Sequence, residues 1–89
     1  MKYRLVDDLT EELKEHIYMY YDMPEDVIIN KVELLADEKG DYYLDVTYDF
    51  DGGKNHVLQM ITGSLNETIT AIVERIKKYR DSFKEVTFK

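Results

Sequence analysis

A strict two-residue alternation from Tyr42 to Phe50 is the feature that most constrains the fold of this chain. Side chains two residues apart in a strand share a face, so the apolar and aromatic set lies on one side: Tyr42, Leu44, Val46, Tyr48 and Phe50. The other side is mostly polar and consists of Tyr43, Asp45, Thr47 and Asp49. A helix, with a period of about 3.6 residues, would scatter both sets. The segment is therefore predicted to be a strand within an antiparallel sheet.

Turn residues before this strand predict a hairpin. The segment 37–40, Asp-Glu-Lys-Gly, suits a type I turn with Gly40 in the left-handed conformation, which gives a G1-bulge hairpin. The preceding strand then spans about 27–36. The turn sets a register in which every predicted pair is apolar or aromatic: Ala36 with Tyr42, Leu34 with Leu44, Val32 with Val46 and Ile28 with Phe50.

A second turn, at 51–54, leads into a third strand at about 55–62. The inward face of this strand is ambiguous, because Val57 and Ile61 have one parity while Leu58 and Met60 have the other. We expect Leu58 and Met60 to face inward.

Helical periodicity is found on both sides of the strands. The first helix is expected from Asp8, which forms a capping box with Glu11, to about Asp22, because Pro24 disfavours a helical Met23. Its apolar stripe comprises Leu9, Leu13, Ile17 and Tyr20 or Tyr21.

The second helix begins at a capping box formed by Ser64 and Glu67. Its apolar seam consists of Leu65, Ile69, Ile72, Ile76, Tyr79 and Phe83. Basic residues crowd its last turns, where the helix dipole favours cations: Arg75, Lys77, Lys78 and Arg80.

These elements predict one α+β domain over residues 1–89, with the order α-β-β-β-α. We expect a three-stranded antiparallel sheet with both helices packed on one face and the other face open. The ends of the chain, Lys2 to Val6 and Val86 to Phe88, have room for short additional strands.

This order resembles the double-stranded-RNA-binding domain. That family binds RNA through a lysine cluster at the start of its second helix and through the loop between its first two strands. Here the second helix opens with residues 63–68, which contain no base, and the hairpin tip at 37–40 is mostly acidic. The resemblance therefore extends to topology only and gives no support to RNA binding.

Charge is distributed unevenly along the chain. Residues 1–51 hold 15 acidic and 5 basic residues, a net charge of −10, whereas residues 52–89 hold 4 acidic and 7 basic residues, a net charge of +3. Acidic surface repels phosphate, so direct binding of nucleic acid or of an anionic membrane by the first half is disfavoured. The basic stretch 75–84 could touch phosphate, but a solvated helix end is the favoured interpretation, and we expect no direct nucleic-acid or membrane partner. A basic protein is the natural complement.

The sequence contains no recognisable catalytic motif. There is no cysteine, only His16 and His56 could act as imidazole bases, and no serine lies in an elbow motif. Asp45, Asp49 and Asp51 with His56 could surround a divalent cation, but their spacing does not fit a calcium loop. We therefore expect no enzyme, no metal site and no cofactor.

The absence of cysteine gives no support to secretion, and the first residues have no apolar segment typical of a signal peptide. We expect a cytoplasmic protein that does not enter membranes.

The favoured hypothesis is a non-enzymatic acidic module that binds a basic or nucleic-acid-binding protein, as phage DNA mimics and anti-CRISPR inhibitors do. Asp41, Asp45 and Asp49 share a strand, and neighbouring side chains on one face of a strand lie roughly 6.6 Å apart, close to the phosphate spacing along a DNA strand. The residues expected to contact the partner are Asp8, Glu11, Glu12, Glu15, Tyr18, Met19, Asp37, Glu38, Asp41, Tyr43, Asp45 and Asp49. Within the run 18–21, at least Tyr18 or Met19 should be exposed.

The alternative hypothesis is self-association through the open face of the sheet. That face is expected to carry enough apolar side chains to pair with a second copy. They are Ile29, Leu35, Tyr43 and, depending on the orientation of the third strand, Val57 and Ile61.

Overall fold

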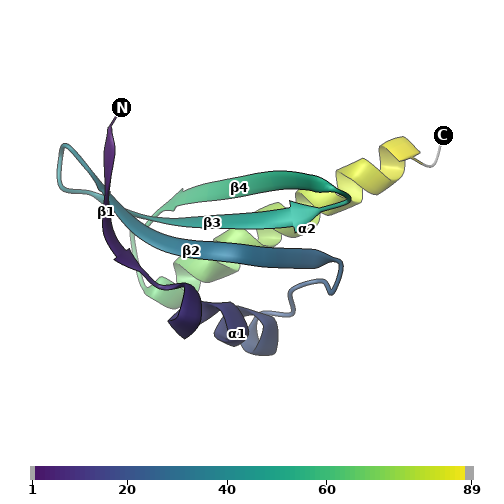
Figure 1. Ribbon diagram of the computed structural model, residues 1–89, viewed down its shortest axis with the longest axis horizontal. Helices are drawn as coiled ribbons and strands as arrows, with labels where there is room; N and C mark the ends of the chain where they lie inside the picture. Colours follow the sequence, from purple (N-terminus) through teal and green to yellow (C-terminus); the bar gives the residue numbers. More distant parts are fainter. Residues whose placement is uncertain (1, 88–89) are drawn as a thin grey trace.

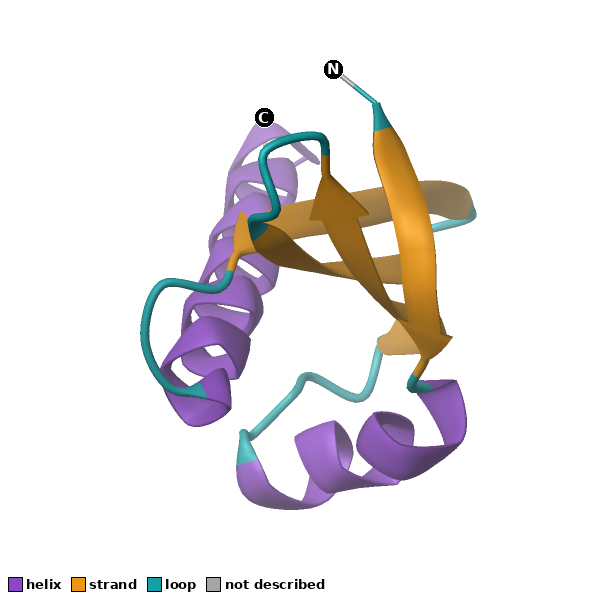
Figure 2. Ribbon diagram, turned by 90° about the vertical axis from the view of Figure 1, so that its left-hand side faces the viewer, coloured by secondary structure: helices purple, strands orange, loops and turns teal. Residues whose placement is uncertain are grey.

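Four antiparallel strands form one sheet, and both helices pack against the same side of it (Figure 1, Figure 2). The computed structural model describes residues 2–87, with side chains for residues 2–82. The elements are β1 (Tyr3–Asp8), α1 (Thr10–Tyr20), β2 (Val27–Asp37), β3 (Tyr42–Phe50), β4 (Gly53–Met60) and α2 (Leu65–Thr87). The α+β class is confirmed, but the expected three-stranded sheet is wrong, because β1 adds a fourth strand beside β2.

The hairpin between β2 and β3 has the predicted turn. Gly40 has a φ of 89°, its N–H donates to the Asp37 carbonyl at 3.2 Å, and the Asp37 N–H donates to the Asp41 carbonyl at 3.0 Å. Three of the predicted pairs are also present: Ala36 with Tyr42, Leu34 with Leu44 and Val32 with Val46.

The predicted pairing of Ile28 with Phe50 is wrong. A bulge between Ile29 and Lys31 adds one residue to β2, so that Val27 pairs with Phe50 instead. One extra residue reverses which side chains face the core. Ile28 is consequently 50% exposed, whereas Ile29 is 0% exposed.

The prediction that Leu58 and Met60 face inward is also wrong. Asp51 and Gly52 have φ values of 52° and 81° and form a two-residue turn that pairs Phe50 with Gly53. This turn places Val57 opposite Val46, and Val57 is buried with it against the helices. Leu58 and Met60 therefore project from the opposite, helix-free face.

The start of α2 is capped as predicted: the Glu67 N–H donates to Ser64 Oγ at 3.1 Å, and the Ser64 N–H donates to Glu67 Oε1 at 3.4 Å. Ile69, Ile72, Val73 and Ile76 are buried beneath the sheet. The backbone remains helical to Thr87, so the strand expected from Val86 does not form; Phe88 lies outside the described residues.

Helix α1 begins later than predicted. Asp8 ends β1, Leu9 occupies the N-cap position, and no capping bond to Glu11 forms. The helix ends at Tyr20, and Asp22 follows in the left-handed conformation with a φ of 54°. Neither helix, within residues 2–87, is long and apolar enough to span a membrane.

Candidate protein-interaction surface

Helix α1 lies along the part of β2 that β1 leaves uncovered. β1 pairs only with residues 33–37 of β2, so the preceding backbone groups need other partners. The Leu9 N–H donates to the Val32 carbonyl at 2.8 Å, and Thr10 Oγ1 accepts the Val32 N–H at 3.0 Å. The Thr10 hydroxyl also donates to Asp8 Oδ1 at 2.6 Å, which, together with the bond from the Thr10 N–H, holds the pKa of Asp8 below its usual range.

Tyr18 fixes the other end of α1 beside the bulge in β2. Its hydroxyl donates to the Val27 carbonyl at 2.7 Å and accepts the Ile29 N–H at 2.8 Å. The side chain therefore occupies the backbone groups that a neighbouring strand would otherwise bond, and its ring is half-buried against the core. Tyr18, expected to contact a partner, is thus held within the fold.

The outer side of α1 carries the surface that we name the acidic helix face: Glu11, Glu12, Glu15, Met19 and Tyr20. All five residues are exposed, and Met19 and Tyr20 are 68% and 67% exposed. None of the three carboxylates forms an ion pair with a residue that the structure describes. The prediction that Tyr18 or Met19 is exposed holds for Met19.

Other acids of the first half are paired within the molecule. Arg80 Nε lies 2.8 Å from Asp26 Oδ1, and Lys77 Nζ lies 3.4 Å from Asp22 Oδ2. The bond to Asp26 raises the pKa of Arg80. The loop before β2 and the basic end of α2 therefore offset part of each other's charge.

The strand acids lie on the helix-free face and also have partners. Asp45 Oδ1 is 3.1 Å from His56 Nδ1, and Asp49 Oδ1 is 3.4 Å from Lys54 Nζ. Asp49 accepts a further bond from Asn30 at 3.0 Å. No cluster of three or more histidine and acidic side chains suited to a metal ion occurs in the described part of the chain.

At the hairpin tip, Asp37 is buried and serves the turn. Its Oδ1 accepts the N–H groups of Lys39 and Asp41 at 2.9 and 3.0 Å, and its Oδ2 accepts the Tyr43 hydroxyl at 2.8 Å. Burial opposes ionisation of Asp37, but these bonds outweigh it and lower the pKa of the carboxyl. The same contact raises the pKa of Tyr43 to about 12.

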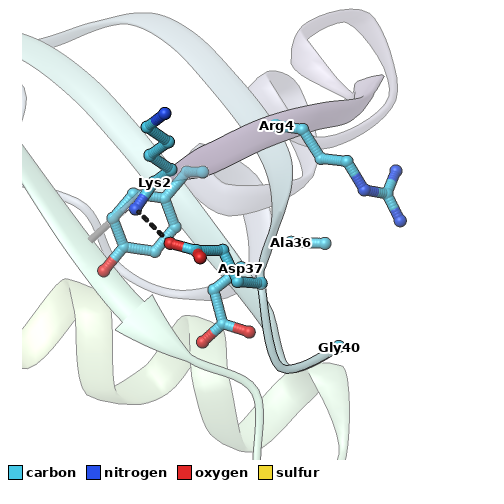
Figure 3. A pocket seen from close by; sticks show the side chains of 7 residues that line it. Lys2, Arg4, Ala36, Asp37 and Gly40 are labelled. Atoms are coloured by element: carbon cyan, nitrogen blue, oxygen red, sulfur yellow. Dashed lines mark hydrogen bonds between the residues drawn. The ribbon is translucent and has the colours of Figure 1, made fainter.

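A cavity of about 510 Å³ lies between this hairpin tip and the start of β1 (Figure 3). The Lys2 backbone N–H donates to Glu38 Oε1 across it at 3.4 Å, and the Arg4 side chain points away from Asp37. The Asp37 carboxylate at this cavity is already engaged by the N–H groups of the turn and by the Tyr43 hydroxyl.

The helix-free face carries an apolar row that crosses all four strands. Leu5 pairs with Leu35, Leu35 with Tyr43, and Tyr43 with Met60, so these four side chains lie directly beside one another. We name them the open-face row. The expected open face was correct for Leu35 and Tyr43.

The other apolar residues expected on the open face lie elsewhere. The bulge in β2 turns Ile29 into the core, and the turn before β4 does the same to Val57. Ile61 packs partly buried against that core. The bulge and the turn have the same effect, since each reverses the parity assumed from the sequence.

The residues expected to contact a partner therefore divide into three groups. Glu11, Glu12, Glu15 and Met19 share the outer side of α1. Asp45 and Asp49 lie on the opposite side of the molecule, on the helix-free face. Glu38 and Asp41 lie exposed at the hairpin tip, whereas Asp8, Tyr18, Asp37 and Tyr43 form bonds within the fold.

Leu5 and Met60 were missed as surface residues. The signal for Leu5 was its place in the short segment 2–6, and the signal for Met60 was its parity with Leu58.

Comparison of the chain with protein-family models, with curated proteins and with solved structures finds no match to any of them.

Proposed function

We propose that this protein is a non-enzymatic acidic module that binds a basic protein through the acidic helix face. The observation that carries the proposal is the sorting of the carboxylates. Asp22, Asp26 and Asp49 are paired with Lys or Arg side chains of the same chain, and Asp45 contacts the ring of His56. Glu11, Glu12 and Glu15 gather on one rigid helix with no such partner among the described residues, next to exposed Met19 and Tyr20.

This combination suits the binding of a basic groove. Residues one helical turn apart, such as Glu11 and Glu15, lie about 5–6 Å apart, so their carboxylates can occupy neighbouring phosphate sites. Charge of one sign speeds association with a groove of the other sign. Met and Tyr are enriched at the centres of protein interfaces, where they supply apolar contact.

The partner we favour is a nucleic-acid-binding protein of the cytoplasm, such as a host defence or DNA-handling enzyme. The module would then act as an inhibitor of the DNA-mimic or anti-CRISPR kind that phages produce. No direct binding of nucleic acid is part of this proposal, because the acidic helix face repels phosphate.

Capture from host lysate tests the proposal when three variants are compared. One carries Glu11→Gln, Glu12→Gln and Glu15→Gln; a control with the same net charge carries Glu25→Gln, Asp41→Asn and Asp51→Asn. We expect the native chain and the control to retain partners that DNA oligonucleotides release, and the first variant to lose them. Retention should also fall as salt rises. Equal capture by both variants would contradict the proposal.

A second candidate function is self-association through the helix-free face, which the open-face row favours. Leu5 and Met60, 56% and 38% exposed, stand at the two ends of this row with half-buried Leu35 and buried Tyr43 between them, and a second copy can match this arrangement. Because each copy has a net charge of −7, association of this kind should strengthen with salt, opposite to docking of the acidic helix face.

Sedimentation at low and high salt tests this second function. A dimer that becomes more stable with salt and is lost in Leu5→Lys and Met60→Lys would support it. A chain that remains monomeric at high concentration in both conditions would exclude it.

A further inference from the structure

The free edge of β4 has backbone groups that point away from the sheet. The two-residue turn makes Phe50 and Gly53 a hydrogen-bonded pair, so every second residue from Gly53 bonds to β3. The backbone groups of Lys54, His56 and Leu58 therefore point outward. The contact between Arg75 Nη1 and the Leu58 carbonyl, at 3.0 Å, agrees with this direction.

A cavity of about 360 Å³ opens beneath this edge, between β4 and α2. Its lining includes Tyr48, Val57, Arg75 and Tyr79, with Lys54 and His56 at the edge itself. In a strand added to β4, alternate side chains would point down beside Val57 and enter this cavity.

Tyr48 brings a shielded polar group to the cavity. The residue is only 2% exposed, and its hydroxyl forms no hydrogen bond with any residue that the structure describes. No fully buried polar side-chain atom of the described residues lacks a partner, so this hydroxyl opens onto the cavity. A ligand atom that accepts a hydrogen bond from this hydroxyl is favoured there. Burial raises the pKa of Tyr48, which keeps the hydroxyl a donor.

The guanidinium of Arg75 selects the charge of the ligand. Arg75 Nη1 also donates to Gln59 Oε1 at 3.1 Å, but a guanidinium has further N–H donors. Lys54 and His56 are exposed at the edge, and their side chains contact aspartates on the helix-free face, so they contribute backbone groups to the site. A carboxylate that accepts from Tyr48 and Arg75 would satisfy both donors.

We propose that the β4 edge binds an extended acidic peptide segment of another protein, which adds as a fifth strand and places a carboxylate between Tyr48 and Arg75. Its backbone bonds to Lys54 and His56 provide affinity, and the carboxylate provides specificity. This site lies on a different element from the acidic helix face and takes a ligand of opposite charge, so the two proposals stand independently.

Nuclear magnetic resonance titration of the full chain with a blocked hexapeptide tests this site. The probe is acetyl-Thr-Val-Glu-Val-Thr-Val-amide, with matched peptides that carry Gln or Lys in place of Glu. We expect the glutamate peptide to shift the amide signals of Lys54 and His56 and to slow exchange of the His56 amide. The Gln peptide should bind roughly tenfold more weakly, because the charged hydrogen bonds are lost.

The variant Tyr48→Phe keeps the buried ring and removes only the hydroxyl, and Tyr42→Phe on β3 is its control. Tyr48→Phe should weaken binding of the glutamate peptide by roughly three- to tenfold and affect the Gln peptide less, since a hydrogen bond to a carboxylate is lost. Equal affinity for the glutamate and lysine peptides, or no effect of Tyr48→Phe, would overturn the proposal. Absence of saturable shifts at the β4 edge up to about 10 mM peptide, weaker than specific recognition, would overturn it as well.

Discussion

At the scale of single residues, two tyrosine hydroxyls bond to polar groups of β2, one at each end of the strand. Tyr18 bonds to the carbonyl of Val27 and to the N–H of Ile29, while Tyr43 bonds to the carboxylate of Asp37 in the hairpin. The role of each tyrosine follows from where its hydroxyl lies in the fold and not from the hydrophobicity of its ring. Tyrosine content alone therefore says little about which rings are available to a partner.

Tyr18→Phe should destabilise the protein by about 1–3 kcal/mol, because two backbone groups of β2 lose the hydroxyl that satisfies them. The free energy of unfolding in urea measures this loss. Tyr20→Phe is the matched control on the same helix, and its exposed ring should leave stability within about 0.5 kcal/mol of the native value. Equal effects of both substitutions would show that the Tyr18 hydroxyl does not hold α1 to β2.

The Asp37 and Tyr43 pair should make stability depend on pH at both extremes. The pKa of Asp37 is lowered, so its contribution is present above the unfolded value and is lost as pH falls through the folded value. The pKa of Tyr43 is raised to about 12, so its contribution is present at neutral pH and is lost as pH rises towards that value.

Tyr43→Phe tests this coupling. In the variant the pKa of Asp37 should move upward, because the carboxylate loses the hydroxyl donor while it remains buried. Carbon-detected resonance titration of Asp37 measures the change. Tyr42→Phe on the neighbouring position is the control, and an unchanged Asp37 titration in Tyr43→Phe would contradict the assigned bond.

At the scale of elements, the sequence predicts what depends on local chemistry. The alternation in β3, the type I turn with Gly40 and the Ser64 cap of α2 all form as expected, because neighbouring residues determine them. The bulge in β2 has no local signal, since it forms where Tyr18 from α1 takes the backbone bonds. The segment of β1 was expected only to have room for a short strand, because its order of polar and apolar residues is irregular.

The acidic helix face is predictable in part for the same reason. Helical spacing alone places Glu11, Glu15 and Met19 on one side of a helix. Local spacing does not separate these free carboxylates from those paired with residues far along the chain, such as Asp26 with Arg80.

The bulge in β2 predicts that truncation of two adjacent isoleucines lowers the free energy of unfolding by very different amounts. Ile29→Ala should cost about 2–5 kcal/mol, because it leaves a cavity in the core. Ile28→Ala removes an exposed side chain and should cost less than about 1 kcal/mol. Urea unfolding of the two variants compares them directly. A larger loss of stability in Ile28→Ala than in Ile29→Ala would contradict the bulge and support the register in which Ile28 pairs with Phe50.

At the scale of the whole molecule, charge is divided between internal pairs and a free surface. The basic end of α2 is bound to the acids of the loop before β2, which draws the two halves together. The carboxylates of the acidic helix face take no part in these ion pairs. Surface charge without an internal partner contributes self-repulsion to a chain whose net charge is already −7.

If the acidic helix face exists for binding, its charges should lower the stability of the isolated protein. Glu11 and Glu15 are four residues apart on α1, and like charges at that spacing destabilise a helix by about 0.2–0.5 kcal/mol. Glu15→Lys converts this repulsion into an attraction of similar size, with glutamate on the favourable N-terminal side. The variant should therefore be about 0.5–1 kcal/mol more stable in urea unfolding at low salt. It should also lose the partners that the native chain captures, whereas Glu25→Lys, on the loop before β2, should retain them. A Glu15→Lys variant that gains stability and still binds would show that the Glu15 carboxylate is not needed for binding.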